Sequence, residues 1–216
     1  DDAMVNRLPG ADDDAVIDVA GISVTHSSGT HTVNSLATSN PFTLSGGALS
    51  IVTTLQVNNT FMLAGGTLSG GSVNFASGQT LSIGNIGGNR TLTGVTINGD
   101  LTLSALAASV KIEGGTKFAN AHLSGANSSL SFAPGQTLTG NILFEGANTG
   151  DRSVVMNGTP GTLTIGPTGS IKTVAGFGGT GAIGGSAGEM TLVNQGLISA
   201  EANNSTLWVK PAALAN

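Results

Sequence analysis

Short triplets of alternating apolar and polar residues recur along the whole 216-residue chain. Because successive side chains of an extended strand point to opposite sides, each triplet places two apolar side chains on one side and a mostly polar one on the other. Gly-Gly, Asn-Gly, Pro-Gly and Ser-Gly pairs, which favour turns, lie between the triplets. The chain is therefore predicted to fold as many short strands, each ended by a turn. The clearest triplets are residues 81–83, 95–97, 101–103, 110–112, 130–132, 163–165 and 207–209.

The composition excludes several other classes of protein. Gly, Thr, Ser and Asn make up 100 of the 216 residues, and all four are poor helix formers. The hydrophobic fraction of 39% and the mean hydropathy of +0.23 are too high for a disordered chain. No run of about 18 apolar residues occurs, so no membrane-spanning helix is expected. The absence of Cys excludes disulfides, thiolate zinc sites and cysteine nucleophiles.

The sequence also repeats itself at longer range. Residues 42–50 (FTLSGGALS) recur as residues 61–69 (FMLAGGTLS), a shift of 19. Residues 75–81 recur as residues 132–138, a shift of 57, which equals three periods of 19. A third similarity, between residues 91–94 and 137–140, has a shift of 46 and does not fit this period. Periods of about 20 residues are typical of solenoids.

Two architectures can be built from short strands. A sandwich or barrel needs longer strands joined by hairpins, whereas a parallel β-helix stacks one rung of the chain on the last at about 4.8 Å. The observed period suits a rung, because like side chains then lie above one another. We therefore expect an all-β, single-stranded parallel β-helix (β-solenoid) of about ten rungs of roughly 19–22 residues, with a right-handed coil.

The charged residues divide the chain into three segments. Residues 1–18 hold six of the eight Asp, and residues 19–89 contain no Asp, Glu, Lys or Arg. Residues 1–18 are therefore predicted to form an N-terminal cap or junction, residues 19–209 the β-helix, and residues 210–216 a tail in which Pro211 ends the last strand. The first residues lack the pattern of a signal peptide, so we expect that one has been removed or that the chain is a fragment. The net charge of −5 and the scattered cations argue against nucleic-acid binding.

Several segments resemble a known group of repeats. Residues 8–18 (LPGADDDAVID) and 44–49 (LSGGAL) are similar to the opening of β-helical repeats in large secreted or cell-surface bacterial proteins. Residues 192–200 (LVNQGLISA) resemble rungs of those repeats and of filamentous-haemagglutinin-like and autotransporter-passenger β-helices. The resemblance implies a β-helical adhesin, matrix or stalk component. A minority of enzymes that degrade polysaccharides share the same scaffold.

Two groups near the N-terminus contain residues that bind metals or move protons. The carboxylates of residues 12–14 and Asp18 could bind Ca²⁺, but their spacing is not that of an EF-hand loop, and a solvated cap is the simpler interpretation. His26 and His31 lie on either side of one predicted turn, and nearby Ser and Asp residues raise the possibility of a hydrolase triad. No Gly-x-Ser-x-Gly motif supports it, so His26, His31 and His122 are interpreted as turn or surface residues.

The charged residues of the central part form the only plausible enzyme site in the sequence. A polysaccharide lyase needs a cation to neutralise the substrate carboxylate and a base for the neighbouring proton. Lys111 and Glu113 alternate with Ile112, so both are expected to face outward. Ordinary solvated faces would explain the same charges. The residues concerned are Arg90, Asp100, Lys111, Glu113 and Lys117, with Glu145, Asp151 and Arg152 one or two rungs further on.

Two further features of the sequence have some of the character of binding sites. The Gly-rich residues 176–181 resemble a phosphate-binding loop, but no Lys-Ser/Thr follows and no helix is predicted there. Trp208 lies between Leu207 and Val209, so alternation places its ring outward, where it could stack on a sugar, contact a neighbouring subunit or cover the last rung.

Together these patterns predict a non-enzymatic structural or adhesive module of an exported bacterial surface or extracellular protein. We expect a rigid rod that self-assembles into a fibre or matrix, or that binds extracellular polysaccharide, without nucleic-acid binding or membrane insertion. The alternative is a β-helical polysaccharide lyase or carbohydrate-binding domain. No catalytic residue, metal ligand or cofactor is assigned.

Overall fold

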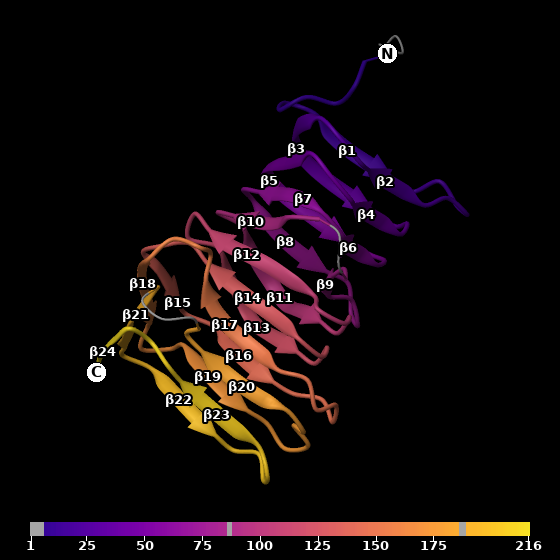
Figure 1. Ribbon diagram of the computed structural model, residues 1–216. Helices are drawn as coiled ribbons and strands as arrows, with labels where there is room; N and C mark the ends of the chain where they lie inside the picture. The colour runs from indigo at the N-terminus through magenta and orange to yellow at the C-terminus, as the bar shows by residue number, and fades with distance from the viewer. Residues whose placement is uncertain (1–6, 86–87, 186–188) are drawn as a thin grey trace.

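The computed structural model describes residues 7–85, 88–185 and 189–216. In this part of the chain there is no helix, and parallel strands stack into a β-solenoid of about nine turns. Figure 1 shows an elongated molecule with its two termini at opposite ends. The prediction of an all-β parallel β-helix is thereby confirmed, with about nine turns in place of about ten.

The strands form three columns, in each of which strand segments from successive turns stack on one another. We name them columns A, B and C in the order in which a turn passes through them. Column A consists of β2 (Val24–His26), β4 (Phe42–Leu44), β6 (Phe61–Leu63), β9 (Leu81–Ile83), the second halves of β11 (Thr96–Leu103) and β13 (Lys117–Leu123), β16 (Asn141–Phe144), β19 (Ser170–Thr173) and β22 (Leu197–Ala200).

Column B follows the first corner of each turn. It consists of the first halves of β3 (Thr30–Thr38) and β5 (Ala48–Val57), then β7 (Gly66–Ser69), β10 (Arg90–Thr93), β12 (Ser109–Glu113), β14 (Ser128–Phe132), β17 (Arg152–Met156), β20 (Thr180–Ile183) and β23 (Thr206–Val209).

Column C completes each turn. It consists of β1 (Asp14–Ile17), the second halves of β3 and β5, β8 (Ser72–Phe75) and the first halves of β11 and β13. A separate four-stranded sheet follows on the same side, formed by β15 (Gln136–Leu138), β18 (Gly161–Ile165), β21 (Met190–Asn194) and β24 (Ala213–Ala215).

The core is a continuous stack of apolar side chains inside the three columns. Alternation directs them inward, as in β6, where Phe61 and Leu63 are fully buried and Met62 between them is exposed. Phe42 lies directly over Phe61, with ring centroids 5.1 Å apart and planes 13° apart. The repeat that joins residues 42–50 to residues 61–69 is therefore one turn of the solenoid.

Column A keeps its register from end to end, although the turns differ in length. In the early part of the chain, Val24 pairs with Phe42 and Phe42 pairs with Phe61, so little sequence separates successive turns. Later, Ile142 pairs with Ile171 and Ile171 pairs with Ile198, and each of these intervals is far longer. The predicted rung length therefore describes the early turns, whereas the late turns carry longer corner loops.

The repeat with a shift of 57 does not connect equivalent positions, which corrects the sequence analysis. Phe75 ends β8 in column C, whereas Phe132 ends β14 in column B. The similarity between residues 91–94 and 137–140 likewise joins different positions, because it connects column B to the separate four-stranded sheet. The same turn sequence serves two different corners, because each corner needs a tight bend at the end of a strand.

One corner between columns A and B depends on glycine. Gly47 has φ +71° and Gly66 has φ +76°, values that L side chains rarely adopt. A Cβ atom at Gly47 would also collide with the Gly29 carbonyl oxygen of the turn below, and one at Gly66 would collide with the Gly47 carbonyl oxygen. The close stacking of backbones at this corner therefore excludes any side chain.

Strands extend beyond residues 19–209 at both ends. β1 lies within the segment predicted as a cap or junction and pairs in parallel with β3. β24 lies within the predicted tail and pairs with β21. Residues 1–6 of the predicted cap lie outside the described residues. Most large apolar side chains that the described residues expose belong to the two end turns: Leu8, Val16, Val19 and Ile22 at one end, and Leu197, Trp208, Val209 and Leu214 at the other.

Candidate functional site

Two of the residues predicted for an enzyme site, Arg90 and Arg152, are buried. Each begins a column B strand and points inward, with exposed fractions of 4% and 0%. This corrects the prediction, because neither guanidinium lies on the outer face. Burial lowers the pKa of both arginines below the ordinary value.

Main-chain carbonyls surround both guanidiniums. Arg152 donates to the carbonyl oxygens of Ser124 at 2.9 Å, Glu145 at 3.0 Å and Asn148 at 3.2 Å, and also to that of Gly150. Its guanidinium lies 5.1 Å from the centroid of the Phe177 ring. Arg90 donates to the carbonyl oxygens of Ser109 and Asn85. Both arginines therefore close corner loops between columns A and B.

His122 lies between two carboxylates on the outer face of column A. Its Nε2 atom is 3.3 Å from Asp100 Oδ2, and its Nδ1 atom is 3.1 Å from Glu145 Oε1. The three side chains come from β11, β13 and the end of β16, so the contact links three successive turns. Since the two acids approach opposite nitrogens of one ring, a single metal ion cannot contact all three residues. No group of three or more His, Cys, Asp or Glu elsewhere in the described segments is placed to hold a metal ion either.

A ladder of hydrogen bonds runs beside His122. Asn120 Nδ2 donates to Asp100 Oδ1 at 2.8 Å, and Asn141 Nδ2 donates to Asn120 Oδ1 at 2.9 Å. Ser170 Oγ then donates to Asn141 Oδ1 at 2.8 Å. These residues share one register position in four turns. Stacking of like side chains in successive rungs was predicted, but these residues were not singled out, although an Asn or Ser at the same strand position of successive rungs is a signal that the sequence contains.

Lys111, Glu113 and Lys117 are on the surface, as predicted for the first two. Lys111 Nζ lies 2.5 Å from Glu113 Oε2 on the outer face of column B. Thr93 Oγ1, one turn before, donates to Glu113 Oε1 at 2.9 Å. The hydrogen bond from Lys111 is the main cause that lowers the pKa of Glu113 below its ordinary value. The structure therefore separates the predicted site into a column A cluster, a column B pair, two buried arginines and two exposed residues, Lys117 in column C and Asp151 directly before β17.

His26 and His31 flank one turn, as predicted, and form a hydrogen-bonded pair. His26 Nε2 lies 2.8 Å from His31 Nδ1, and His26 Nδ1 lies 2.9 Å from the Gly46 carbonyl oxygen. Because that carbonyl can only accept, a neutral His26 donates from Nδ1 and accepts at Nε2 from His31. Both residues occupy inward positions that Leu44 and Leu49 fill in the next turn. The pair therefore covers one end of the apolar core.

The N-terminal carboxylates make separate local contacts. Asp13 binds Arg7, with Arg7 Nη2 2.6 Å from Asp13 Oδ1, and accepts from the Gly10 amide at 2.6 Å. The bond from Arg7 is the largest cause that lowers the Asp13 pKa to about 2. Asp14 accepts from Ser35 Oγ at 2.6 Å and from the side chain of Asn34, and both bonds lower its pKa. Asp13 therefore fixes the segment before β1, and Asp14 ties β1 to β3.

Trp208 faces outward, as its position between Leu207 and Val209 predicts. Its side chain is 48% exposed, and Lys210 Nζ lies 4.0 Å from the centroid of its ring. The ring therefore belongs to the exposed C-terminal end of the solenoid.

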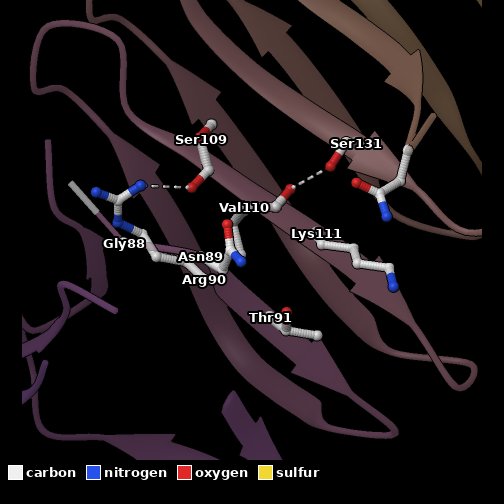
Figure 2. A pocket seen from close by; sticks show the side chains of 9 residues that line it. Gly88, Asn89, Arg90, Thr91, Ser109, Val110, Lys111 and Ser131 are labelled. Atoms are coloured by element: carbon white, nitrogen blue, oxygen red, sulfur yellow. Dashed lines mark hydrogen bonds between the residues drawn. The ribbon is translucent and has the colours of Figure 1, made fainter. Parts of the chain in front are cut away.

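A polar depression of about 290 Å³ lies on the outer face of column B. Thr91, Lys111 and Ser131 occupy the same register position of β10, β12 and β14 and form its floor. Figure 2 shows these side chains together with that of Asn89. Alternation predicts the outward direction of Lys111, whereas Thr91 and Ser131 were not predicted as its neighbours, although the three residues recur at a constant spacing in the sequence. The full lining is Gly88, Asn89, Arg90, Thr91, Ser109, Val110, Lys111, Ser131 and Asn157.

Comparisons with known proteins yield no relative. No protein family, no curated protein and no solved structure matches the chain. Among the described residues, no helix has the length and apolar character needed to cross a membrane.

Proposed function

We propose that the protein is a non-enzymatic structural or adhesive module, a rigid rod from an exported bacterial surface or extracellular protein. The observation that carries the proposal is the unbroken register of column A through turns of very different length. Successive turns share one continuous apolar core, so the rod resists bending between turns. Low charge and many Thr, Ser and Asn residues support an extracellular location.

The contacts of the charged residues support a role without catalysis. Arg90 and Arg152 are used to close loops inside the solenoid. Asp100 and Glu145 are both engaged by His122, and Lys111 is engaged by Glu113. A polysaccharide lyase would need a free base beside its cation, whereas Asp100 and Glu145 are held by His122 on column A and Lys111 lies on column B, and we propose binding rather than cleavage. Incubation with acidic polysaccharides, followed by ultraviolet detection of unsaturated products, tests this point, because product formation would contradict it.

Self-association of the rod ends is the second part of the proposal. Among the described residues, the end turns expose large apolar side chains, and β22, β23 and β24 each pair with a strand on one side only. Exposed strand edges recruit other chains. The residues 19–89 carry no Asp, Glu, Lys or Arg that would oppose such contacts.

Small-angle scattering and negative-stain microscopy of the purified protein test both parts. A rod-like particle supports the structural role, and a compact particle would refute it. Concentration-dependent end-to-end growth supports assembly, and monodisperse monomers at high concentration would refute that part alone. Leu214→Lys is expected to suppress growth because Leu214 lies at the C-terminal end. Leu106→Lys is the matched control, because both leucines are 57% exposed and Leu106 is remote from the end turns.

A further inference from the structure

The depression on the outer face of column B has the composition of a ligand site. Its side chains offer an ammonium from Lys111, amides from Asn89 and Asn157 and hydroxyls from Thr91 and Ser131. The volume of about 290 Å³ is at the lower end of small-molecule sites. Neither a carboxylate nor an aromatic ring belongs to its lining among the described residues. Such a surface suits a small ligand rich in hydroxyl groups that carries one negative charge.

Lys111 has a carboxylate partner that a ligand can replace. Glu113 follows two positions later on the same strand and lies outside the lining of the depression. Both side chains are about one-third exposed, at 31% and 28%. Exposed ion pairs of this kind contribute little to stability. Exchange of Glu113 for the acidic group of a ligand therefore costs little, and Glu113 retains Thr93 as a donor.

The acidic N-terminal segment does not repel an anion at this position. Lys111 lies about four turns from Asp18, which corresponds to about 20 Å along the solenoid axis. That distance is about two and a half times the screening length at physiological salt. From residue 19 onward the chain has six acidic and six basic residues. The local charge of Lys111 therefore governs what binds there.

We propose that this depression is a subsite for one acidic sugar residue, whose carboxylate or sulfate group binds Lys111 in place of Glu113 while its hydroxyls bind the surrounding amides and hydroxyls. The inference rests on the proposed adhesive role and assigns it a ligand class. Without an aromatic ring for stacking, a single subsite binds weakly, and useful adhesion comes from many rods acting on one polymer.

Titration of the purified protein, followed by amide chemical shifts, tests the proposal with three probes. Tetragalacturonate carries carboxylates, glucose 6-sulfate carries a sulfate, and maltotetraose is neutral. Binding of at least one acidic probe with shifts centred on Thr91, Lys111 and Ser131 supports the subsite, and the better acidic probe identifies the acid group. Equal response to the neutral probe, or no response to any of the three, would overturn it.

Three variants separate ligand binding from a structural role of the ion pair. Lys111→Ala is expected to weaken binding about tenfold or more, because a charge-assisted hydrogen bond is lost. Lys172→Ala is the matched control, since Lys172 is also 31% exposed and paired with a carboxylate, Glu201. Glu113→Gln is expected to strengthen binding, because it removes the competitor for Lys111. Equal effects of the two lysine variants, or unchanged affinity in Glu113→Gln, would refute the proposal, whereas the rod itself is judged separately by scattering.

Discussion

Replacement of Arg152 by Met tests how a buried cation without a carboxylate partner stabilises this solenoid. Arg152 is fully buried, and its guanidinium donates to four main-chain carbonyls at one corner. Met preserves much of the side-chain volume but cannot donate a hydrogen bond. The variant therefore leaves carbonyls such as those of Ser124 and Glu145 without their donor.

The expected loss follows from the two best-placed bonds, at 2.9 and 3.0 Å. Hydrogen bonds from a charged donor contribute about 1.5–3 kcal/mol each, so together they contribute about 3–6 kcal/mol. Removal of the desolvation cost of the buried charge offsets part of this sum. We expect Arg152→Met to lower the free energy of unfolding by about 2–4 kcal/mol.

Denaturant unfolding followed by circular dichroism measures this change, with Lys117→Met as an exposed control. Hydrogen exchange should also show faster opening of the loop at residues 145–151, whose carbonyls Arg152 binds. Arg152→Lys is expected to lose most of the same stability, because one ammonium cannot reach acceptors on several sides. Unchanged or higher stability of Arg152→Met would show that desolvation outweighs the hydrogen bonds and would refute the reasoning.

Three further predictions concern other parts of the solenoid. Leu63→Ala should lower the free energy of unfolding by about 3–5 kcal/mol, because Leu63 is fully buried between two turns; a denaturant midpoint equal to that of the wild type would contradict this. Asp13 should titrate near a pKa of about 2, so its stabilising contribution holds above the ordinary pKa and is lost as the pH falls toward 2. In Arg7→Ala an NMR titration should place the Asp13 midpoint closer to its ordinary value, and an unmoved midpoint would show that Arg7 is not the cause. His122→Phe should cost at most about 1 kcal/mol, since its contacts with the two carboxylates are partly exposed; a loss of several kcal/mol in thermal unfolding would mean that the cluster holds the turns together.

The fold was predictable because alternation and stacking act locally. The alternation of residues 101–103 within β11 shows which side chains point inward and which point outward. The recurrence of Phe42 as Phe61 shows the number of residues in one turn. The register of later turns was not predictable in the same way. Corner loops change length freely because they contact solvent, so equal spacing fails where column A passes from Ile142 to Ile171.

The candidate site was predictable only where side-chain direction follows from alternation. Lys111 and Glu113 were placed correctly on the outer face for that reason. Arg152 was not, because the carbonyls that hold it belong to loops whose path the sequence pattern does not define. Nor could the pairing of His122 with Glu145 be predicted, since it depends on how two strands from different turns align.

The strand register of column A stays constant whatever the length or composition of the corner loops. The short interval from Val24 to Phe42 and the long one from Ile142 to Ile171 both return the chain to the same inward positions. Duplication of one turn would therefore lengthen the protein by about 4.8 Å without a new core having to evolve. Insertions at a corner would likewise add surface without shifting the strands. In such a chain, the number of turns sets the length of the solenoid, and the corner loops set its surface, so the two can change independently.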